Sequence, residues 1–162
     1  MIYLDTSALI KRYLPERNSD RFDAWFAEHA PASVSRLTFV EARSTLARKR
    51  RDKTIRASRE SAAMDEIRTD LQDGVLWIQP CGDEHFVEAF HLMEQLRNVP
   101  LRTLDALHLA VARLGEFSGL AHVDQHRLVL VDQTHRITGG QGGTAALGDH
   151  RPDQQRTGDE GG

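Results

Sequence analysis

The chain has 162 residues, of which 40% are hydrophobic and 28% charged, and it contains a single cysteine. These proportions are typical of a globular domain with one core, and no apolar run approaches the roughly 18 residues that would span a membrane. One cysteine excludes an intramolecular disulfide and a cysteine-based zinc cluster, and the N-terminus has no signal-peptide pattern, so we expect a cytoplasmic protein without a membrane partner.

A strongly basic segment lies in the middle of this chain, whose net charge is −3. Between residues 43 and 59 the sequence has eight arginines or lysines and a single acid, Asp52. Clustered positive charge of this kind can follow a phosphate backbone. A solvated face of a helical pair has the same composition, and the segment alone does not distinguish the two.

The N-terminal half of the chain predicts short strands that alternate with helices. Residues 1–4 form a continuous apolar run that ends at Asp5, as expected for a strand buried on both faces of a parallel sheet. Phe22, Trp25 and Phe26 form the apolar stripe of a helix. The other expected elements are strands at 32–35 and 75–78, and helices at 7–13, from 18 or 19, from 38 into the basic segment, and at 54–71.

The C-terminal half continues this alternation. Phe86, Phe90 and Met93, with Leu92 or Leu96, form the apolar face of the next expected helix. Strands that alternate with helices predict an α/β fold with a parallel sheet and helices on both of its faces. The expected elements are helices over 83–97 and 103–114, a strand over 120–123 and a further apolar run over 128–131.

The sequence changes character after residue 138. The last 24 residues contain eight of the 12 glycines and almost no large apolar side chains. Such a segment cannot bury enough surface to offset the entropy lost on ordering. We therefore expect one domain over 1–138, followed by a disordered, glycine-rich tail over 139–162.

Two acids follow expected strands. Asp5 ends the first strand and is followed by Thr6 and Ser7, and Asp124 ends the fourth. Ligands of open α/β sheets bind beyond the carboxyl ends of the strands, so both acids suit a binding site. Aspartate is also a frequent N-cap and turn residue, which gives both positions a structural alternative. Asp132 follows the next apolar run and competes with Asp124.

Two further acids lie near the starts of expected apolar helices. Glu41 follows Thr38 by three residues, a spacing that also predicts a capping box in which the glutamate bonds the Thr38 amide. Asp105 lies in a helix that is apolar almost all round, where its neighbours one and two turns on are Leu109 and Ala112. An ionised carboxylate there needs a counter-charge or solvent. A favourable interaction with the helix dipole is the structural alternative.

These four acids point to a metal site when they are considered together. Carboxylates gathered in one cleft repel one another, so some would be protonated unless a cation neutralises them. A hard divalent ion with oxygen ligands, Mg²⁺ or Mn²⁺, meets that requirement. The eight histidines show no metal-ligand spacing, and we expect His108, on its apolar helix, to have a supporting role in the core or beside the site.

Four segments together resemble the PIN-domain nucleases, and in particular the VapC toxins of bacterial toxin–antitoxin pairs. The sequence Asp-Thr-Ser-Ala-Leu at 5–9 resembles their first acidic motif, and Val-Glu-Ala-Arg at 40–43 resembles the second. Leu-Asp-Ala-Leu-His-Leu-Ala at 104–110 resembles the third and is the most specific of the four. The strand and acid within 120–128 resemble the fourth, so the resemblance covers nearly all of the expected domain.

The resemblance implies a three-layer α/β/α fold with a central parallel sheet, and an endoribonuclease that depends on Mg²⁺ or Mn²⁺. Asp5, Asp105 and Asp124 would bind the metal, and Glu41 would complete the catalytic cluster of acids. A metal-activated water would then hydrolyse RNA phosphodiester bonds and leave 5′-phosphate and 3′-hydroxyl ends. The hydroxyls of Thr6 and Ser7, which follow Asp5, would form hydrogen bonds to a metal ligand or to the RNA phosphate.

The resemblance also implies partners. The toxins of this family pair with a small VapB-like antitoxin that covers the active site, and they usually form homodimers. The basic segment would guide either the RNA backbone or acidic groups of the antitoxin. Its densest part consists of Arg48, Lys49, Arg50 and Arg51.

The chain departs from the family pattern near its C-terminus, and two other functions are considered beside the nuclease. His122 stands where the fourth motif usually has Thr or Ser, and the glycine-rich segment follows soon after. These departures favour a catalytically impaired PIN-like domain that acts by binding RNA or the antitoxin. An aspartate-based phosphotransferase is a further alternative because Asp5 ends the first strand, although Ser7 stands where such enzymes usually have a second acid.

Overall fold

The computed structural model describes residues 1–16, 19–115, 117, 119–124, 127–132 and 144–146, with side chains described through residue 121. Its centre is a six-stranded sheet with the strand order β3-β2-β1-β4-β5-β6. Strands β1 to β4 pair in parallel, whereas β5 and β6 are antiparallel additions beyond β4. The strands are β1 (Ile2–Leu4), β2 (Ala32–Ser35), β3 (Leu76–Gln79), β4 (Gly119–Asp124), β5 (Arg127–Asp132) and β6 (Thr144–Ala146).

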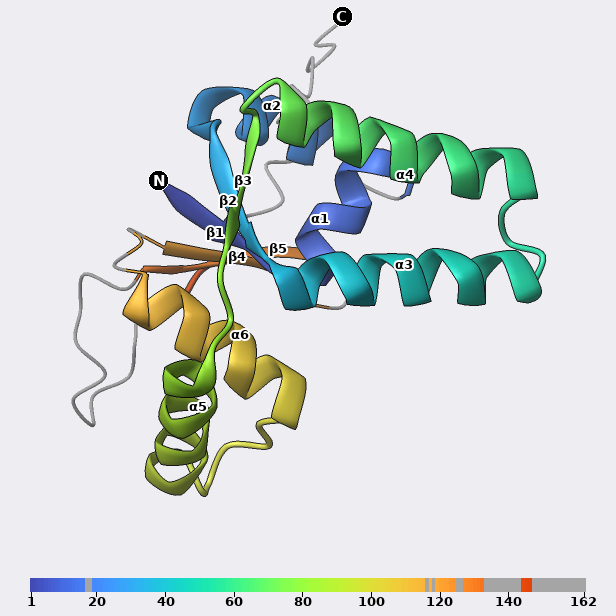
Figure 1. Ribbon diagram of the computed structural model, residues 1–162. Helices are drawn as coiled ribbons and strands as arrows, with labels where there is room; N and C mark the ends of the chain where they lie inside the picture. The colour runs from blue at the N-terminus through green and yellow to red at the C-terminus, as the bar shows by residue number, and fades with distance from the viewer. Residues whose placement is uncertain (17–18, 116, 118, 125–126, 133–143, 147–162) are drawn as a thin grey trace, which may run out of the picture.

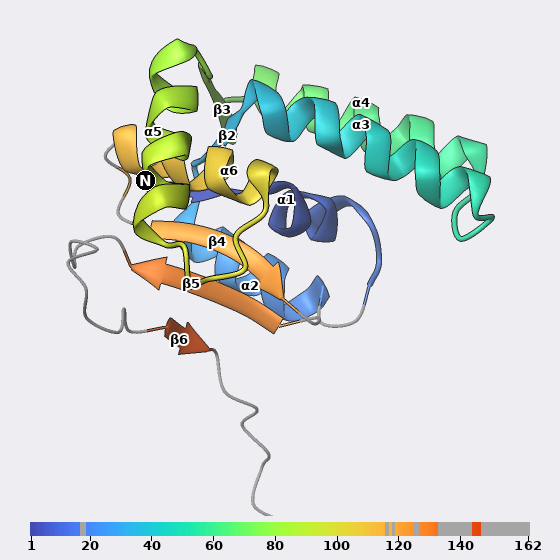
Figure 2. The same ribbon diagram turned by 90° about the horizontal axis from the view of Figure 1, so that it is seen from below.

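Helices cover both faces of this sheet, as Figures 1 and 2 show. Four helices lie on one side, and their core with the sheet contains Leu4, Trp25 and Leu46. The remaining two pack on the other side, where β1 contributes Tyr3 to the core. The predicted three-layer α/β/α architecture is therefore confirmed. The helices are α1 (Thr6–Tyr13), α2 (Ser19–His29), α3 (Arg36–Arg51) and α4 (Ala57–Gln72) on the first side, and α5 (Asp83–Gln95) and α6 (Thr103–Leu114) on the second.

The N-terminal strand is buried on both faces, as its apolar sequence predicts. The side chains of Tyr3 and Leu4 are both fully buried, and they enter different core clusters because successive side chains of a strand point to opposite faces. Strand β1 also lies between β2 and β4 in the sheet. The residue that follows this strand therefore emerges at the middle of the carboxyl edge.

Helices α3 and α4 form a long hairpin that extends away from the sheet (Figure 1). The turn between them includes Lys53 with φ of 58°, which ends α3 and delays the start of α4 to Ala57, three residues later than predicted. Near the turn, the buried carboxylate of Glu60 accepts a hydrogen bond from Arg43 and forms an ion pair with Arg50, so one acid joins the two helices.

The exposed face of α5 differs from the prediction. Phe86, Phe90 and Met93 are expected from sequence to face the core, but they are 55%, 61% and 39% exposed. The helix instead packs on α6 through the smaller Ala89 and through Leu92. Helix α5 has apolar residues on two of its sides. The contact with α6 buries the side with Ala89 and Leu92, and the side with Phe86 and Phe90 stays exposed.

The segment predicted to be a disordered tail contains β6, which pairs with β5. The other residues of 139–162 lie outside the described part of the chain, so the boundary at residue 138 stays a prediction. Among the described helices, none has the length and apolar content required to cross a membrane.

Candidate active site

The site begins at Asp5, the residue directly after β1. Its side chain caps α1, because its Oδ1 accepts hydrogen bonds from the Ala8 amide at 2.8 Å and from the Ser7 hydroxyl at 2.7 Å. Its backbone amide donates to the carbonyl of Ala121 on β4 at 3.1 Å. The structural alternative, an N-cap, is therefore correct for Asp5. The same contacts hold a partly exposed carboxylate at the carboxyl edge of the sheet.

Glu41 lies on α3 and faces the same edge. Its Oε2 accepts a hydrogen bond from the Thr6 hydroxyl at 2.5 Å, which joins it to the residue next to Asp5. Burial by itself would raise the pKa of Glu41, but hydrogen bonds from His108 and Thr6 outweigh it and lower the pKa below its ordinary value. The nearby charge of Asp5 acts in the opposite sense, so the two carboxylates are close enough to repel each other.

The capping-box alternative for Glu41 is wrong. The capping box at the start of α3 is formed by Ser35 and Thr38, whose side chains bond each other's backbone amides at 3.1 and 3.2 Å. Helix α3 consequently begins at Arg36, two residues before the predicted start. Glu41 is free of that role and is held by groups from α1 and α6 instead.

His108 of α6 joins Glu41 to the core. Its Nε2 lies 2.6 Å from Oε2 of Glu41, and its Nδ1 lies 2.7 Å from the hydroxyl of Tyr3. Tyr3 is fully buried, and desolvation raises its pKa to about 12, so its hydroxyl stays protonated. His108 is buried with both ring nitrogens in contact with polar groups, as expected for a supporting histidine of the core, whereas sequence reasoning missed Tyr3. A phenol between apolar residues of a buried strand was the available signal, because a buried hydroxyl needs partners.

Asp105 lies in the first turn of α6, one turn before His108. Residues three apart on a helix are neighbours on its surface, so the backbone places Asp105 on the side of α6 that carries the contact to Glu41. Its side chain is exposed, and Leu104 beside it is 44% exposed. Solvent therefore satisfies this carboxylate, and the apolar surroundings inferred from sequence do not by themselves require a cation there.

The sheet topology separates the two candidates for the fourth acid. Strand β4 is parallel to β1 and pairs Ala121 with Leu4, so Asp124 at its end lies toward the carboxyl edge that holds Asp5. Strand β5 is antiparallel, and Asp132 pairs with Gly119 at the start of β4. The backbone thus favours Asp124 over Asp132, whereas their side chains lie outside the described part of the chain.

A complete metal site is not formed by the side chains that the structure describes. Among these residues, no three groups of His, Cys, Asp or Glu are arranged so that they could hold a metal ion. Asp5 and Glu41 supply carboxylate oxygens, which are the donors that Mg²⁺ and Mn²⁺ prefer, and Thr6 and Ser7 orient one each. The chemistry of these donors fits such an ion, and the metal assignment of Asp5, Asp105 and Asp124 stays a prediction.

The predicted basic segment has two kinds of residue. Lys49 and Arg50 form ion pairs with Glu16 and Glu60, at 2.6 and 2.7 Å. Arg48 and Arg51 are exposed and form no ion pair within the described ranges. Only part of the segment's charge is therefore available to a phosphate or to an acidic partner.

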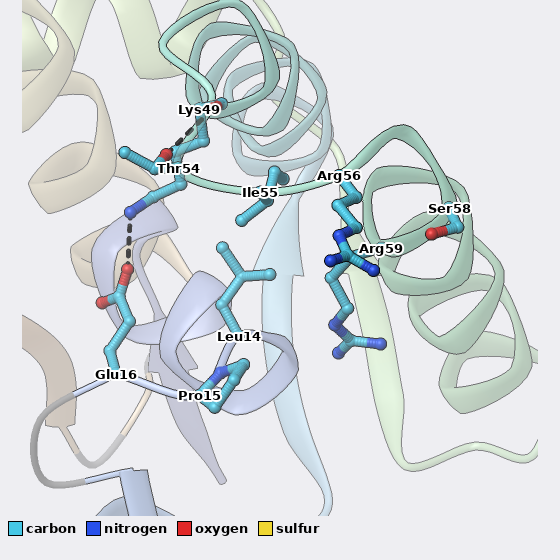
Figure 3. A pocket seen from close by; sticks show the side chains of 9 residues that line it. All are labelled: Leu14, Pro15, Glu16, Lys49, Thr54, Ile55, Arg56, Ser58 and Arg59. Atoms are coloured by element: carbon cyan, nitrogen blue, oxygen red, sulfur yellow. Dashed lines mark hydrogen bonds and ion pairs between the residues drawn. The ribbon is translucent and has the colours of Figure 1, made fainter.

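A hollow of about 340 Å³ lies beside the basic segment, between the end of α1 and the α3–α4 turn. In Figure 3, Leu14, Pro15 and Ile55 lie at its centre, and Arg56 and Arg59 lie along one side. The carboxylate of Glu16 and the ammonium of Lys49 close the opposite side. The lining contains none of the four candidate acids, so this hollow is separate from the candidate active site.

Comparison with known proteins identifies the class to which this α/β domain belongs. Residues 2–129 match the PIN domain family, and the chain belongs to that family. None of the curated proteins compared with it matches.

Several solved structures share the fold, and two of them are described as a toxin and a toxin–antitoxin complex. VapC20 of Mycobacterium tuberculosis, described as a toxin that cleaves the sarcin–ricin loop, is 17% identical with a TM-score of 0.62, over 76% of this chain and 90% of that one. A toxin–antitoxin complex from Klebsiella pneumoniae is 18% identical with a TM-score of 0.52, over 74% and 83%. FitAcB from Neisseria gonorrhoeae is 17% identical with a TM-score of 0.58, over 78% and 89%. At such identities, the likeness establishes the fold.

Proposed function

We propose that this chain is a ribonuclease that requires Mg²⁺ or Mn²⁺ and serves as the toxin of a toxin–antitoxin pair. The proposal rests on the proximity of Asp5 and Glu41, two carboxylates from distant parts of the chain that meet beside Thr6. Like charges brought together at the carboxyl edge of a sheet favour a bound cation. Asp124, which ends the neighbouring strand β4, would join them.

Each acid has a role in this proposal. Asp5, Asp105 and Asp124 would hold the cation through carboxylate oxygens. When bound, the cation supplies a water that is deprotonated near neutral pH and offsets charge on the phosphate oxygens. Glu41 is ionised at neutral pH because its pKa is lowered, so its carboxylate can accept a hydrogen bond from the attacking water. Thr6 and Ser7 keep Glu41 and Asp5 in their orientations.

The proposed partners are RNA, an antitoxin and a second copy of the chain. The resemblance of the acidic motifs to VapC toxins supports all three, and the similar Klebsiella structure is a toxin–antitoxin complex. Exposed Arg48 and Arg51 are suited to the anionic partners. A VapB-like protein would inhibit the enzyme by covering the acidic edge, that is, the carboxyl edge of the sheet that holds Asp5 and Glu41. We propose that the pair acts in the cytoplasm.

RNA cleavage with controlled metal content tests the proposal. The purified chain should cut RNA, lose that activity in EDTA and recover it with Mn²⁺ or Mg²⁺. Asp105→Asn should abolish cleavage, because an amide is a neutral and weaker ligand than a carboxylate. Asp132→Asn is the matched control, since β5 carries this residue to the opposite edge of the sheet. Full activity of Asp105→Asn, or equal losses in both variants, would contradict the proposed site.

A catalytically impaired domain is the second candidate. It is favoured by His122, which stands where the fourth acidic motif of the family usually has Thr or Ser. Such a protein would bind RNA or an antitoxin without cleaving RNA. Titration calorimetry separates the two candidates, because the nuclease should bind Mn²⁺ at millimolar concentrations or below, whereas an impaired domain should give no heat of binding.

A further inference from the structure

A cluster of buried hydroxyls lies behind the candidate active site. The hydroxyl of Tyr3 donates to Oγ of Ser35 at 2.9 Å and lies 3.2 Å from Oγ1 of Thr38. Ser35 and Thr38 are fully buried and also form the capping box of α3. Tyr3 is therefore anchored to the first turn of the helix that carries Glu41. Its third neighbour, at 2.7 Å, is Nδ1 of His108.

The imidazole of His108 spans the distance from this cluster to the acidic edge. The residue is 5% exposed, and its two ring nitrogens contact Tyr3 on one side and Glu41 on the other. An ionised carboxylate only accepts hydrogen bonds, so the Nε2 atom must carry the proton that it shares with Glu41. The contact to Tyr3 prevents the ring from turning away. The proton on Nε2 is thus fixed by the contact to Glu41, and the orientation of the ring is fixed by the contacts to Glu41 and Tyr3.

One oxygen of Glu41 receives all of these contacts. Its Oε2 accepts from Nε2 of His108 and from the Thr6 hydroxyl, and in the described part of the chain Oε1 has no hydrogen-bond partner. Two donors from different helices fix a carboxylate more narrowly than either does alone, because each excludes rotamers that the other permits. Oε1 remains as the oxygen that is available to a water, a cation or RNA.

We propose that His108 is a positioning residue for the active site, which holds Oε2 of Glu41 through Nε2–H and leaves Oε1 for the reaction. The inference rests on the proposed function in one respect, because it takes Glu41 to be part of the active site. A purely structural role explains the arrangement less well, because the neighbours Leu107, Ala110 and Val111 fill the same helix with apolar groups. A buried histidine brings two ring nitrogens that need hydrogen-bond partners. Here Nδ1 contacts Tyr3 and Nε2 contacts Glu41.

The test compares two substitutions of His108 with a control on the same helix. His108→Leu removes both contacts, whereas His108→Gln keeps an amide N–H that can reach Glu41. Leu107→Ala removes a buried side chain that packs against α5 and leaves the imidazole in place. Mn²⁺ affinity by calorimetry should fall about ten- to a hundredfold in His108→Leu, recover largely in His108→Gln, and change less than about twofold in Leu107→Ala. Equal losses in His108→Leu and Leu107→Ala, or no recovery with glutamine, would overturn the inference.

A measurement on the metal-free protein keeps this inference separate from the proposed function. The Nε2 proton of His108 should give a slowly exchanging signal in ¹H–¹⁵N NMR spectra, because the ring is buried and hydrogen-bonded. Glu41→Gln should shift that signal, whereas Asp132→Asn should not. If the wild type binds no Mn²⁺ and cuts no RNA while the signal responds to Glu41→Gln, the nuclease proposal fails and the positioning contact stands. A signal that is absent in the wild type, or unchanged by Glu41→Gln, would refute the contact itself.

Discussion

Nε2 of His108 lies 2.6 Å from Oε2 of Glu41, so residues 67 positions apart in the chain meet at the acidic edge of the sheet. This contact connects α6 to α3, and through Thr6 it reaches the first turn of α1. Three helices that pack on different faces of the sheet are thereby tied together beside Asp5. The position of the acids relative to one another depends on this polar connection as well as on the apolar core.

Acid should weaken the fold through Glu41. Hydrogen bonds from His108 and Thr6 oppose the effect of burial and hold the pKa of Glu41 below 4.5, its ordinary value. A carboxyl group with a lowered folded-state pKa contributes stability above its unfolded pKa and loses it as the pH falls through the folded one. Urea unfolding of the wild type should therefore show a loss of stability below a pH of about 4.5. Glu41→Gln should show a smaller loss over that range, and an identical profile would contradict the lowered pKa.

Removal of the Tyr3 hydroxyl should destabilise the protein and disturb the site. Tyr3→Phe leaves three buried polar neighbours with one fewer partner, at a cost of about 1–3 kcal/mol in the free energy of unfolding. Tyr13→Phe is the control, because its hydroxyl donates to Asp70 at 2.7 Å on another part of the fold. Both variants should unfold at lower urea concentration. RNA cleavage should fall only in Tyr3→Phe, and equal activity of the two variants would show that the hydroxyl has no part in the site.

Arg48 and Arg51 should contribute to anion binding more than Arg50 does. The first two form no ion pair in the described residues, whereas Arg50 is held by Glu60. In the Asp105→Asn background, the double change Arg48→Ala and Arg51→Ala should weaken RNA binding in fluorescence anisotropy. It should also reduce the dependence of binding on salt, by about one unit of slope for each phosphate that is no longer bound. A larger effect from Arg50→Ala would indicate that its pair with Glu60 opens on binding.

Neighbouring residues of α5 should differ sharply in their effect on stability. Leu92 is fully buried against α6, so Leu92→Ala should cost about 2–5 kcal/mol in the free energy of unfolding. Phe90 is 61% exposed, and Phe90→Ser should change stability by less than about 0.5 kcal/mol. Urea unfolding of dilute protein checks both values. A large loss in Phe90→Ser would mean that this face is covered, and sedimentation would then identify a second copy of the chain.

Most of the secondary structure could be predicted from the sequence, because local patterns determine it. The apolar run before Asp5, the stripe of Phe22, Trp25 and Phe26, and the helix over 103–114 all appear as expected. Element boundaries differ from the prediction where a single contact shifts them. Ser35 and Thr38 start α3 two residues early, and the turn at Lys53 delays α4.

The sequence also identified the acids as candidates, since carboxylates at strand ends and in apolar helices are unusual enough to be noticed. It could not decide between Asp124 and Asp132, because both follow short apolar runs. Only strand direction separates them, and the pairing of β5 with β4 is a long-range property of the sheet. The same limit applies to α5, whose aromatic residues face outward because α6 packs on its other side.

By itself, the sequence determined the alternation of strands and helices, the family to which the chain belongs, and the acidic side chains that are candidates for the site. The tertiary structure alone decided which of those side chains meet. Local propensity is set by neighbours a few residues apart, whereas the contacts among Tyr3, Glu41 and His108 require three segments to be brought together by the packing of a common core. The buried polar connection behind the acidic edge is accordingly the feature of this protein that no local pattern contains.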